Sequence, residues 1–217
     1  MSLTSSGNST VYVNNNTVSQ HFLSVNTAIK IQNIMMKLPP KTTYKIIFRK
    51  GGKTLFEHDL CYDTNRYIVP FLYREENIII WKKILPLNQD ERLLSHTFLH
   101  NNSMKIMYDI SKAILSLKKS EIVHNDTVLD NIGICDGVFV LFDFDGSGSF
   151  QEKGKDNYAD FCSLRNSFKF RNIIVKDLPG IHSIIEYYSR LKNISLEKAF
   201  NELENLKISY SDSIQES

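Results

Sequence analysis

The residues whose types and spacing could do chemistry lie in one short stretch of this chain. His124 and Asp126 follow a short apolar pair, and Asn131 comes five residues after Asp126. Twelve residues further on, Asp143 and Phe144 follow an apolar run of strand length. Carboxylate and amide oxygens are the ligands that hard cations such as Mg²⁺ prefer, and a carboxylate can act as a general base. The stretch therefore contains side chains that could bind a divalent cation and accept a proton.

In order and spacing these residues resemble the protein-kinase motifs H-R-D-x-x-x-x-N and D-F-G. The chain is thus similar to members of the protein-kinase-like superfamily. This resemblance implies that Asp126 is the catalytic carboxylate, that Asn131 and Asp143 hold Mg²⁺, and that ATP is the phosphate donor. It also implies that His124 ties the catalytic loop to the strand that leads to Asp143. The expected activity is that of a serine/threonine protein kinase.

A second segment narrows the resemblance. Only about a dozen residues separate Asp145 from the helix expected to begin near Asp156, which is too short for the activation loop and A-P-E signature of ordinary protein kinases. The segment 155–164 instead resembles the matching helix of small atypical kinases, the RIO-like group and the KEOPS-complex kinase. By this resemblance Asp160 braces the backbone of the catalytic loop from beneath.

The N-terminal part matches less well. A kinase small lobe supplies a glycine-rich loop over the phosphates and a strand lysine paired with a helix glutamate, and no G-x-G-x-x-G occurs here. The candidates for the phosphate-binding lysine are Lys45 and Lys50, with Lys30 a distant third. Because no acid precedes Glu57 in the chain, the partner is expected to be Glu57 or Asp59.

The catalytic loop also departs from the kinase pattern. Asn125 replaces the usual arginine, Val128 stands where many serine/threonine kinases have a lysine, and Asp145 replaces the glycine of D-F-G. An acid at this last position is familiar in small-molecule kinases, so the resemblance leaves the acceptor open between a protein hydroxyl and a small-molecule hydroxyl. The missing charge at Val128 would reduce stabilisation of the transferred group.

Hydrophobic periodicity and turn residues predict an α+β chain. The resemblance makes this a two-lobed protein-kinase-like fold, with a small β-rich N-lobe and a larger, mainly helical C-lobe. We expect a polar, mobile lead-in at 1–17, a divergent β-rich lobe at 18–87, a helical lobe at 88–210 and a tail at 211–217. The expected helices are 18–38, 90–99, 103–119 with Ser103 as its cap, 156–168, 178–191 and 195–207. The expected strands are 44–48, 54–56, 67–73, 77–84, 131–135 and 138–142.

Composition excludes several classes of protein. With 42% hydrophobic residues the chain can bury a core, and no apolar stretch approaches the roughly 20 residues that cross a bilayer. Its start lacks the order of a signal peptide, and three widely spaced cysteines favour reduced thiols. We therefore expect an intracellular protein, cytoplasmic or nuclear, or a viral protein in a host cell.

The net charge of +2 conceals an uneven distribution, because residues 1–56 contain no acid and seven basic residues. This part could contact a nucleic acid or another anionic surface, although a solvated basic face explains the lysines more simply. The missing glycine-rich loop and the uncertain lysine leave a further alternative open. The chain could be a pseudokinase that binds nucleotide and regulates a protein partner.

Overall fold

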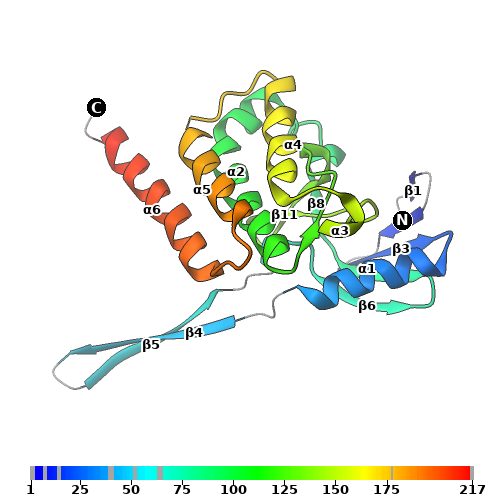
Figure 1. Ribbon diagram of the computed structural model, residues 1–217, viewed down its shortest axis with the longest axis horizontal. Coiled ribbons are helices and arrows are strands. Elements are labelled where there is room, and N and C mark those ends of the chain that lie inside the picture. Colours follow the sequence, from blue (N-terminus) through cyan, green and yellow to red (C-terminus); the bar gives the residue numbers. More distant parts are fainter. Residues whose placement is uncertain are drawn as a thin grey trace.

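The chain folds into an antiparallel sheet and a group of helices, as shown by a computed structural model (Figure 1). The architecture is α+β, as the sequence predicts. The structure describes residues 3–6, 9–13, 16–38, 42–50, 53–62, 66–176 and 178–215, with side chains for 9–13, 16–38, 66–176 and 178–206. No helix of this described part is long and apolar enough to cross a membrane.

The main sheet has five antiparallel strands in the order β1-β2-β3-β7-β6. These strands are β1 (Leu3–Ser6), β2 (Ser9–Val13), β3 (Thr17–Phe22), β6 (Phe71–Glu75) and β7 (Ile78–Lys82). Helix α1 (Val25–Lys37) lies between β3 and β6 in the chain and contacts both strands. It buries Ala28 and Ile31 in the same core as Ile79 and Trp81, so burial of one helix face holds α1 on the sheet.

Two expectations for this region are wrong. Residues 1–17 were expected to be a mobile lead-in, but they contain β1, β2 and the start of β3. The helix expected at 18–38 begins only at Val25, because the preceding residues form β3 and pair with β7, where Val18 lies opposite Trp81. Pairing with the apolar strand β7 stabilises β3, and β2 and β1 extend the same sheet from β3. Local propensity alone does not indicate this arrangement.

The hairpin expected after α1 is present and longer than expected. Strands β4 (Thr42–Lys50) and β5 (Lys53–Tyr62) pair with each other in antiparallel register. They are not part of the five-stranded sheet, and Figure 1 shows the hairpin extending away from the rest of the fold.

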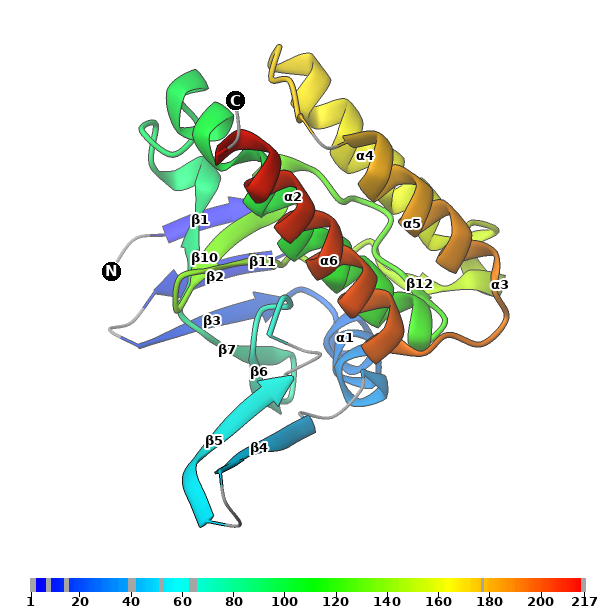
Figure 2. The ribbon, with the colours of Figure 1, turned by 90° about the vertical axis from the view of Figure 1, so that its left-hand side faces the viewer.

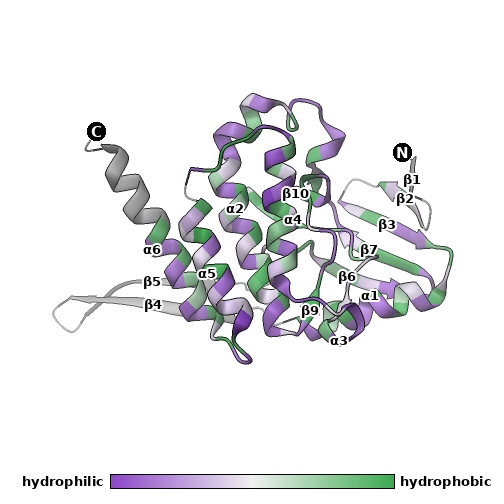
Figure 3. Ribbon diagram, turned by 45° about the horizontal axis from the view of Figure 1, so that its top comes forward, coloured by the Kyte–Doolittle hydropathy of each residue, from purple (hydrophilic) through white to green (hydrophobic). Residues whose placement is uncertain are grey.

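The second half of the chain is built around α2 (His96–Lys119), most of whose residues from Ser103 onward are buried. The helices α4 (Asn157–Phe170), α5 (Leu178–Arg190) and α6 (Leu196–Gln215) each contact α2 (Figure 2). Hydrophobic and hydrophilic stretches alternate along α2, α4 and α5 (Figure 3), as expected for helices that bury one face.

The start of α2 differs from the prediction. Helices were expected at 90–99 and 103–119, but one helix runs through both segments from His96. Its cap is Ser95, whose Oγ accepts a hydrogen bond from the Phe98 N–H at 3.3 Å. Ser103 is buried inside the helix and donates its hydroxyl to the carbonyl of His100 at 3.0 Å. Because serine can bond the preceding turn as well as cap a helix, its presence alone does not mark a start.

Short strands connect the helices at the junction with the sheet. Strand β10 (Ile132–Cys135) pairs with β11 (Val138–Leu141) and with β8 (Leu85–Pro86), while β9 (Ile122–Val123) pairs with β12 (Gly148–Ser149) next to α3 (Phe150–Lys153). A parallel bridge joins Ile68 to Leu141, and the Val69 N–H donates to the Leu141 carbonyl at 2.9 Å. This contact holds the segment before β6 against the end of β11, just before Asp143.

Candidate functional site

Asp126 and Asn131 are joined by direct hydrogen bonds. The Nδ2 of Asn131 donates to the backbone carbonyl of Asp126 at 2.9 Å and to its Oδ2 at 2.8 Å. Asn131 is buried at the end of a short 3-10 helix (Leu129–Asn131), whereas Asp126 is exposed. Because Nδ2 is used in both bonds, the amide oxygen of Asn131 remains available for a cation, and Asp126 is held in one orientation.

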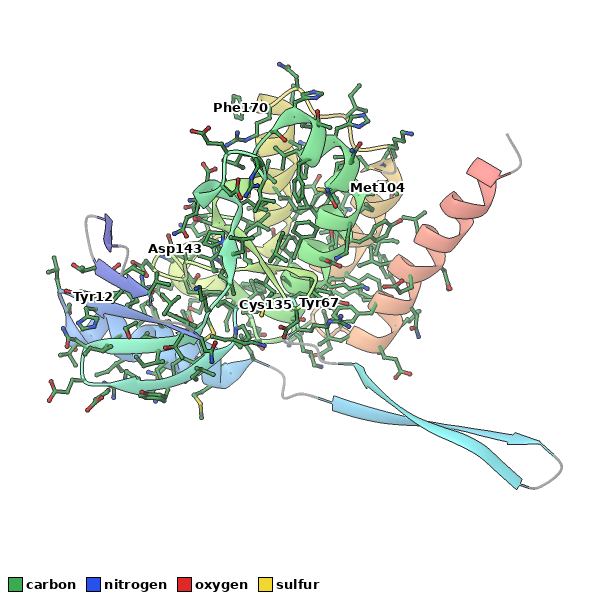
Figure 4. All side chains as sticks on the ribbon, turned by 180° about the vertical axis from the view of Figure 1, so that it is seen from behind. Tyr12, Tyr67, Met104, Cys135, Asp143 and Phe170 are labelled. Atoms are coloured by element: carbon green, nitrogen blue, oxygen red, sulfur yellow. The ribbon has the colours of Figure 1, made fainter. Side chains whose placement is uncertain are left out.

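Asp143 comes two residues after the end of β11 and has a φ of 64°, in the left-handed region that few non-glycine residues adopt. Its carboxylate accepts a hydrogen bond from the backbone N–H of Asp145. Burial and the negative charge of Asp126 both raise the pKa of Asp143, so the two carboxylates lie within electrostatic reach. Figure 4 shows Asp143 where the sheet meets the helical part.

His124 makes the expected contact with the segment that leads to Asp143. Its Nε2 donates to the Phe142 carbonyl at 2.9 Å. The ring stands edge-on to Phe144, with 4.7 Å between the ring centres. The side chain is fully buried, and this burial lowers the pKa of His124 to about 4. His124 is therefore neutral at pH 7 and joins the loop 124–131 to the segment at Phe142.

Asp160 contacts the backbone of the loop that begins at His124, a contact that the resemblance implies. One carboxylate oxygen accepts the His124 N–H at 2.9 Å and the other accepts the Asn125 N–H at 2.8 Å. Burial raises the pKa of Asp160 to about 6, and the two backbone hydrogen bonds oppose this rise. The neighbouring Asn157 donates to the Ile122 carbonyl at 2.7 Å. Helix α4 thus positions the loop through its first turn.

Gln20 is a site residue that the sequence analysis missed. This residue of β3 accepts a hydrogen bond from Trp81 Nε1 at 3.1 Å and donates to Ser9 Oγ at 3.0 Å. It also hydrogen-bonds to Asp145, which opposes the rise of the Asp145 pKa to about 6 caused by burial and by Asp143. The alternation of β-branched and polar residues on either side of Asn14-Asn15-Asn16 could have indicated the β2–β3 hairpin.

The main candidates for phosphate binding lie on the β4–β5 hairpin, outside the group formed by Asp126, Asn131 and Asp143. Lys45, Lys50 and Glu57 belong to the β4–β5 hairpin, where Lys45 lies opposite Asp59 and Glu57 lies opposite Ile47. Their side chains are outside the described part of the chain. Figure 4 shows this hairpin apart from Asp143. Lys30, the third candidate, forms an ion pair with Glu152 at 3.1 Å. The structure therefore does not bring these four residues together with Asp126, Asn131 and Asp143.

The donor set suits Mg²⁺ that is bound together with a substrate. In the described ranges, no group of three or more His, Cys, Asp or Glu side chains could hold a metal by itself. Mg²⁺ commonly takes one or two carboxylates and completes its octahedron with phosphate oxygens and water. Asp143 and the Asn131 amide oxygen fit this mode. The Oδ1 of Asp145 is shielded from solvent and has no hydrogen-bond partner within the described part, which leaves a further oxygen next to them.

Comparison with models of known protein families finds no match. A comparison with curated proteins also finds no match.

Proposed function

We propose that this protein is an ATP- and Mg²⁺-dependent phosphotransferase with a two-lobed protein-kinase-like fold. The observation that carries the proposal is the hydrogen bond from Asn131 to Asp126, made beside Asp143. It puts a carboxylate for the acceptor hydroxyl next to two groups that suit Mg²⁺. The sheet order and the position of α1 before β6 support two lobes, with the site at their junction.

Each side chain has a separate part in the proposed reaction. Asp126 accepts the proton of the acceptor hydroxyl while its oxygen attacks the γ-phosphorus of ATP, and the bond between that phosphorus and the β–γ bridging oxygen breaks to release ADP. Asp143 and Asn131 would hold Mg²⁺, which neutralises charge on the phosphates. His124 and Asp160 touch no substrate in this scheme. They position the loop through the contacts at Phe142 and at the Asn125 N–H.

Transfer of labelled γ-phosphate tests the proposal. Purified protein is incubated with ATP and Mg²⁺, with itself, with a protein mixture and with a panel of small alcohols as acceptors. We expect Mg²⁺-dependent transfer that EDTA abolishes and that Asp126→Asn removes. Asp130→Asn is the matched control, because Asp130 lies on the same loop but pairs with Arg171 at the surface, at 3.1 Å. Absence of transfer to every acceptor would falsify the proposal.

Gln20 favours a second candidate, a nucleotide-binding pseudokinase that regulates a partner. In protein kinases a lysine on the third strand contacts the phosphates, whereas β3 of this sheet presents the uncharged Gln20 to Asp145. Without the positive charge of that lysine, stabilisation of the transition state would be weaker, while the proposed metal ligands would stay in place. Thermal unfolding with Mg-ATP separates the two candidates, since stabilisation without any transfer supports the pseudokinase.

A further inference from the structure

Half of the residues that line one pocket are lysines, and the pocket shares no lining residue with the candidate site. Its volume is about 280 Å³, and its lining comes from the ends of α1 and α2 and from the connection between α5 and α6. The lining residues are Lys37, Lys118, Lys119, Ser120, Glu121, Lys192, Asn193 and Ile194. We call it the lysine pocket. Four lysines face one glutamate there, so the pocket is strongly positive.

Internal hydrogen bonds fix the walls of the lysine pocket. Lys119 donates its ammonium group to the Ile194 carbonyl at 3.1 Å, and the Ser120 hydroxyl donates to the Lys37 carbonyl at 2.8 Å. These bonds join all three parts of the chain that line the pocket. A ligand would therefore meet backbone walls that are already in place, while the exposed side chains of Lys37 and Lys192 would be ordered on binding.

The positive charges of the pocket are incompletely neutralised by the protein. Lys37 and Lys192 form no ion pair with an acid among the residues that the structure describes. The Lys118 ammonium lies 4.8 Å from the centre of the Phe150 ring, and burial lowers the pKa of Lys118. Helix dipoles favour lysines at the C-terminal ends of α1 and α2, and Lys192 follows the C-terminal end of α5 by two residues.

We propose that the lysine pocket binds a small anion with two or more phosphate groups, held between Lys37, Lys119 and Lys192. Phosphate oxygens accept several charge-assisted hydrogen bonds at once, and lysine ammonium groups supply the donors. The volume of about 280 Å³ is just below the roughly 300–1,000 Å³ of drug-sized ligand sites, which suits an anion as small as pyrophosphate or triphosphate. This site is independent of the proposed phosphotransferase function.

Calorimetric titration of the full chain with sodium pyrophosphate in the presence of EDTA tests the proposal. EDTA removes the metal that a phosphate would need at Asp143, so the acidic site repels the probe. We expect binding that weakens as salt is added. The double variant Lys37→Gln/Lys192→Gln should bind pyrophosphate at least about tenfold more weakly, because each lysine contributes a charge-assisted hydrogen bond.

The control removes the same charge elsewhere. Lys176 and Lys198 are exposed and do not line the pocket, so Lys176→Gln/Lys198→Gln should keep the affinity of the unchanged protein. Lys192→Gln alone, in an exposed connection, provides the measurement if the first double variant fails to fold. Absence of binding, or an equal loss in both double variants, overturns the proposal. A single-stranded oligonucleotide serves as a second probe. If Lys37→Gln/Lys192→Gln loses binding to the oligonucleotide but keeps binding to pyrophosphate, the assignment to a small anion is overturned.

Discussion

The side chain of Asn131 holds the carboxylate of Asp126 through a 2.8 Å hydrogen bond. One asparagine thus orients the proposed catalytic carboxylate with its nitrogen and keeps its oxygen for a cation. The two residues are five positions apart, and the 3-10 turn that ends at Asn131 makes the contact possible. Because the roles are different, substitutions at the two positions should have different effects.

Asp126→Asn should remove transfer and spare nucleotide binding. Asparagine at this position still offers an acceptor oxygen to Asn131, but it cannot take the proton of an acceptor hydroxyl. We expect the transfer rate at saturating Mg-ATP to fall about 10²–10⁴-fold, with little change in nucleotide affinity measured by titration. An unchanged transfer rate would show that Asp126 is not the proton acceptor.

Asn131→Leu should weaken the response to Mg²⁺ as well as transfer. Leucine has a similar size but offers neither the oxygen for a cation nor the donor that orients Asp126. We expect the Mg²⁺ concentration for half-maximal ATP binding to rise about 10–100-fold, as is common when metal-site contacts are lost. The measurement is a Mg²⁺ titration at fixed ATP, with Asp126→Asn as comparison. Equal Mg²⁺ dependence in the two variants would contradict the assignment of Asn131 as a ligand.

Asp160→Ala should destabilise the protein strongly. It removes the acceptor of two backbone N–H groups, those of His124 and Asn125, and alanine leaves both without that acceptor in a buried loop. We expect the free energy of unfolding to fall by about 2–4 kcal/mol, measured by urea denaturation. Asp130→Ala is the control, because its partly exposed pair with Arg171 contributes only about 0–1 kcal/mol. Similar losses in both variants would mean that Asp160 does not brace the loop.

His124 and Asp160 should affect stability with opposite dependence on pH. Burial lowers the pKa of His124 from 6.5 to about 4, so the unfolded chain binds more protons in this window and stability falls as pH falls. The pKa of Asp160 is raised from 3.8 to about 6, so the folded chain binds more protons there and stability rises as pH falls. In the unchanged protein the two effects largely cancel between pH 6 and pH 4.

His124→Gln should remove one side of this balance. The amide nitrogen of glutamine reaches about as far as the imidazole Nε2 and can still donate to the Phe142 carbonyl, but glutamine does not titrate. We expect the variant to gain stability, relative to the unchanged protein, by up to about 1.4 kcal/mol per pH unit as the pH falls from 6 to 4. Urea denaturation at several pH values measures this difference. Parallel pH profiles for the two proteins would contradict a neutral, buried His124.

The contacts expected in the candidate site came from the resemblance of its motifs and not from local pattern, since Asp160 is 36 residues from His124 in the chain. The His124 contact at Phe142 and the Asp160 contacts with the loop were both expected, and both are present. The choice of Lys45 and Lys50 as phosphate-binding candidates depended instead on predicting which strands form the main sheet. Strands β1 to β3 are short and polar. Of these, β3 pairs with β7, and β2 and β1 extend the sheet from β3, which pattern reading at 1–22 does not detect. Candidate lysines were therefore sought on the β4–β5 hairpin, and the place of Gln20 on β3 was not expected.

Gln20→Lys tests whether the missing cation limits nucleotide binding. A lysine at this position of β3 would direct its ammonium group toward Asp145 and the bound phosphates, as the strand lysine of kinases does. It would also leave Trp81 Nε1 without its acceptor, at a cost of about 1–3 kcal/mol in the free energy of unfolding. We expect roughly tenfold tighter binding of Mg-ATP, the gain typical of one hydrogen bond to a charged group.

The matched control for this substitution is Gln20→Met, which has a similar length and no charge. It loses the same bonds to Trp81 and Ser9, so its stability should fall by a similar amount, while its affinity for Mg-ATP should not rise. If both variants bind nucleotide alike, the side chain at position 20 does not reach the phosphates, and the lysine of this site must come from another part of the chain. A gain in affinity with Gln20→Lys alone places the phosphates between β3 and Asp145, because no other charge differs between the two variants.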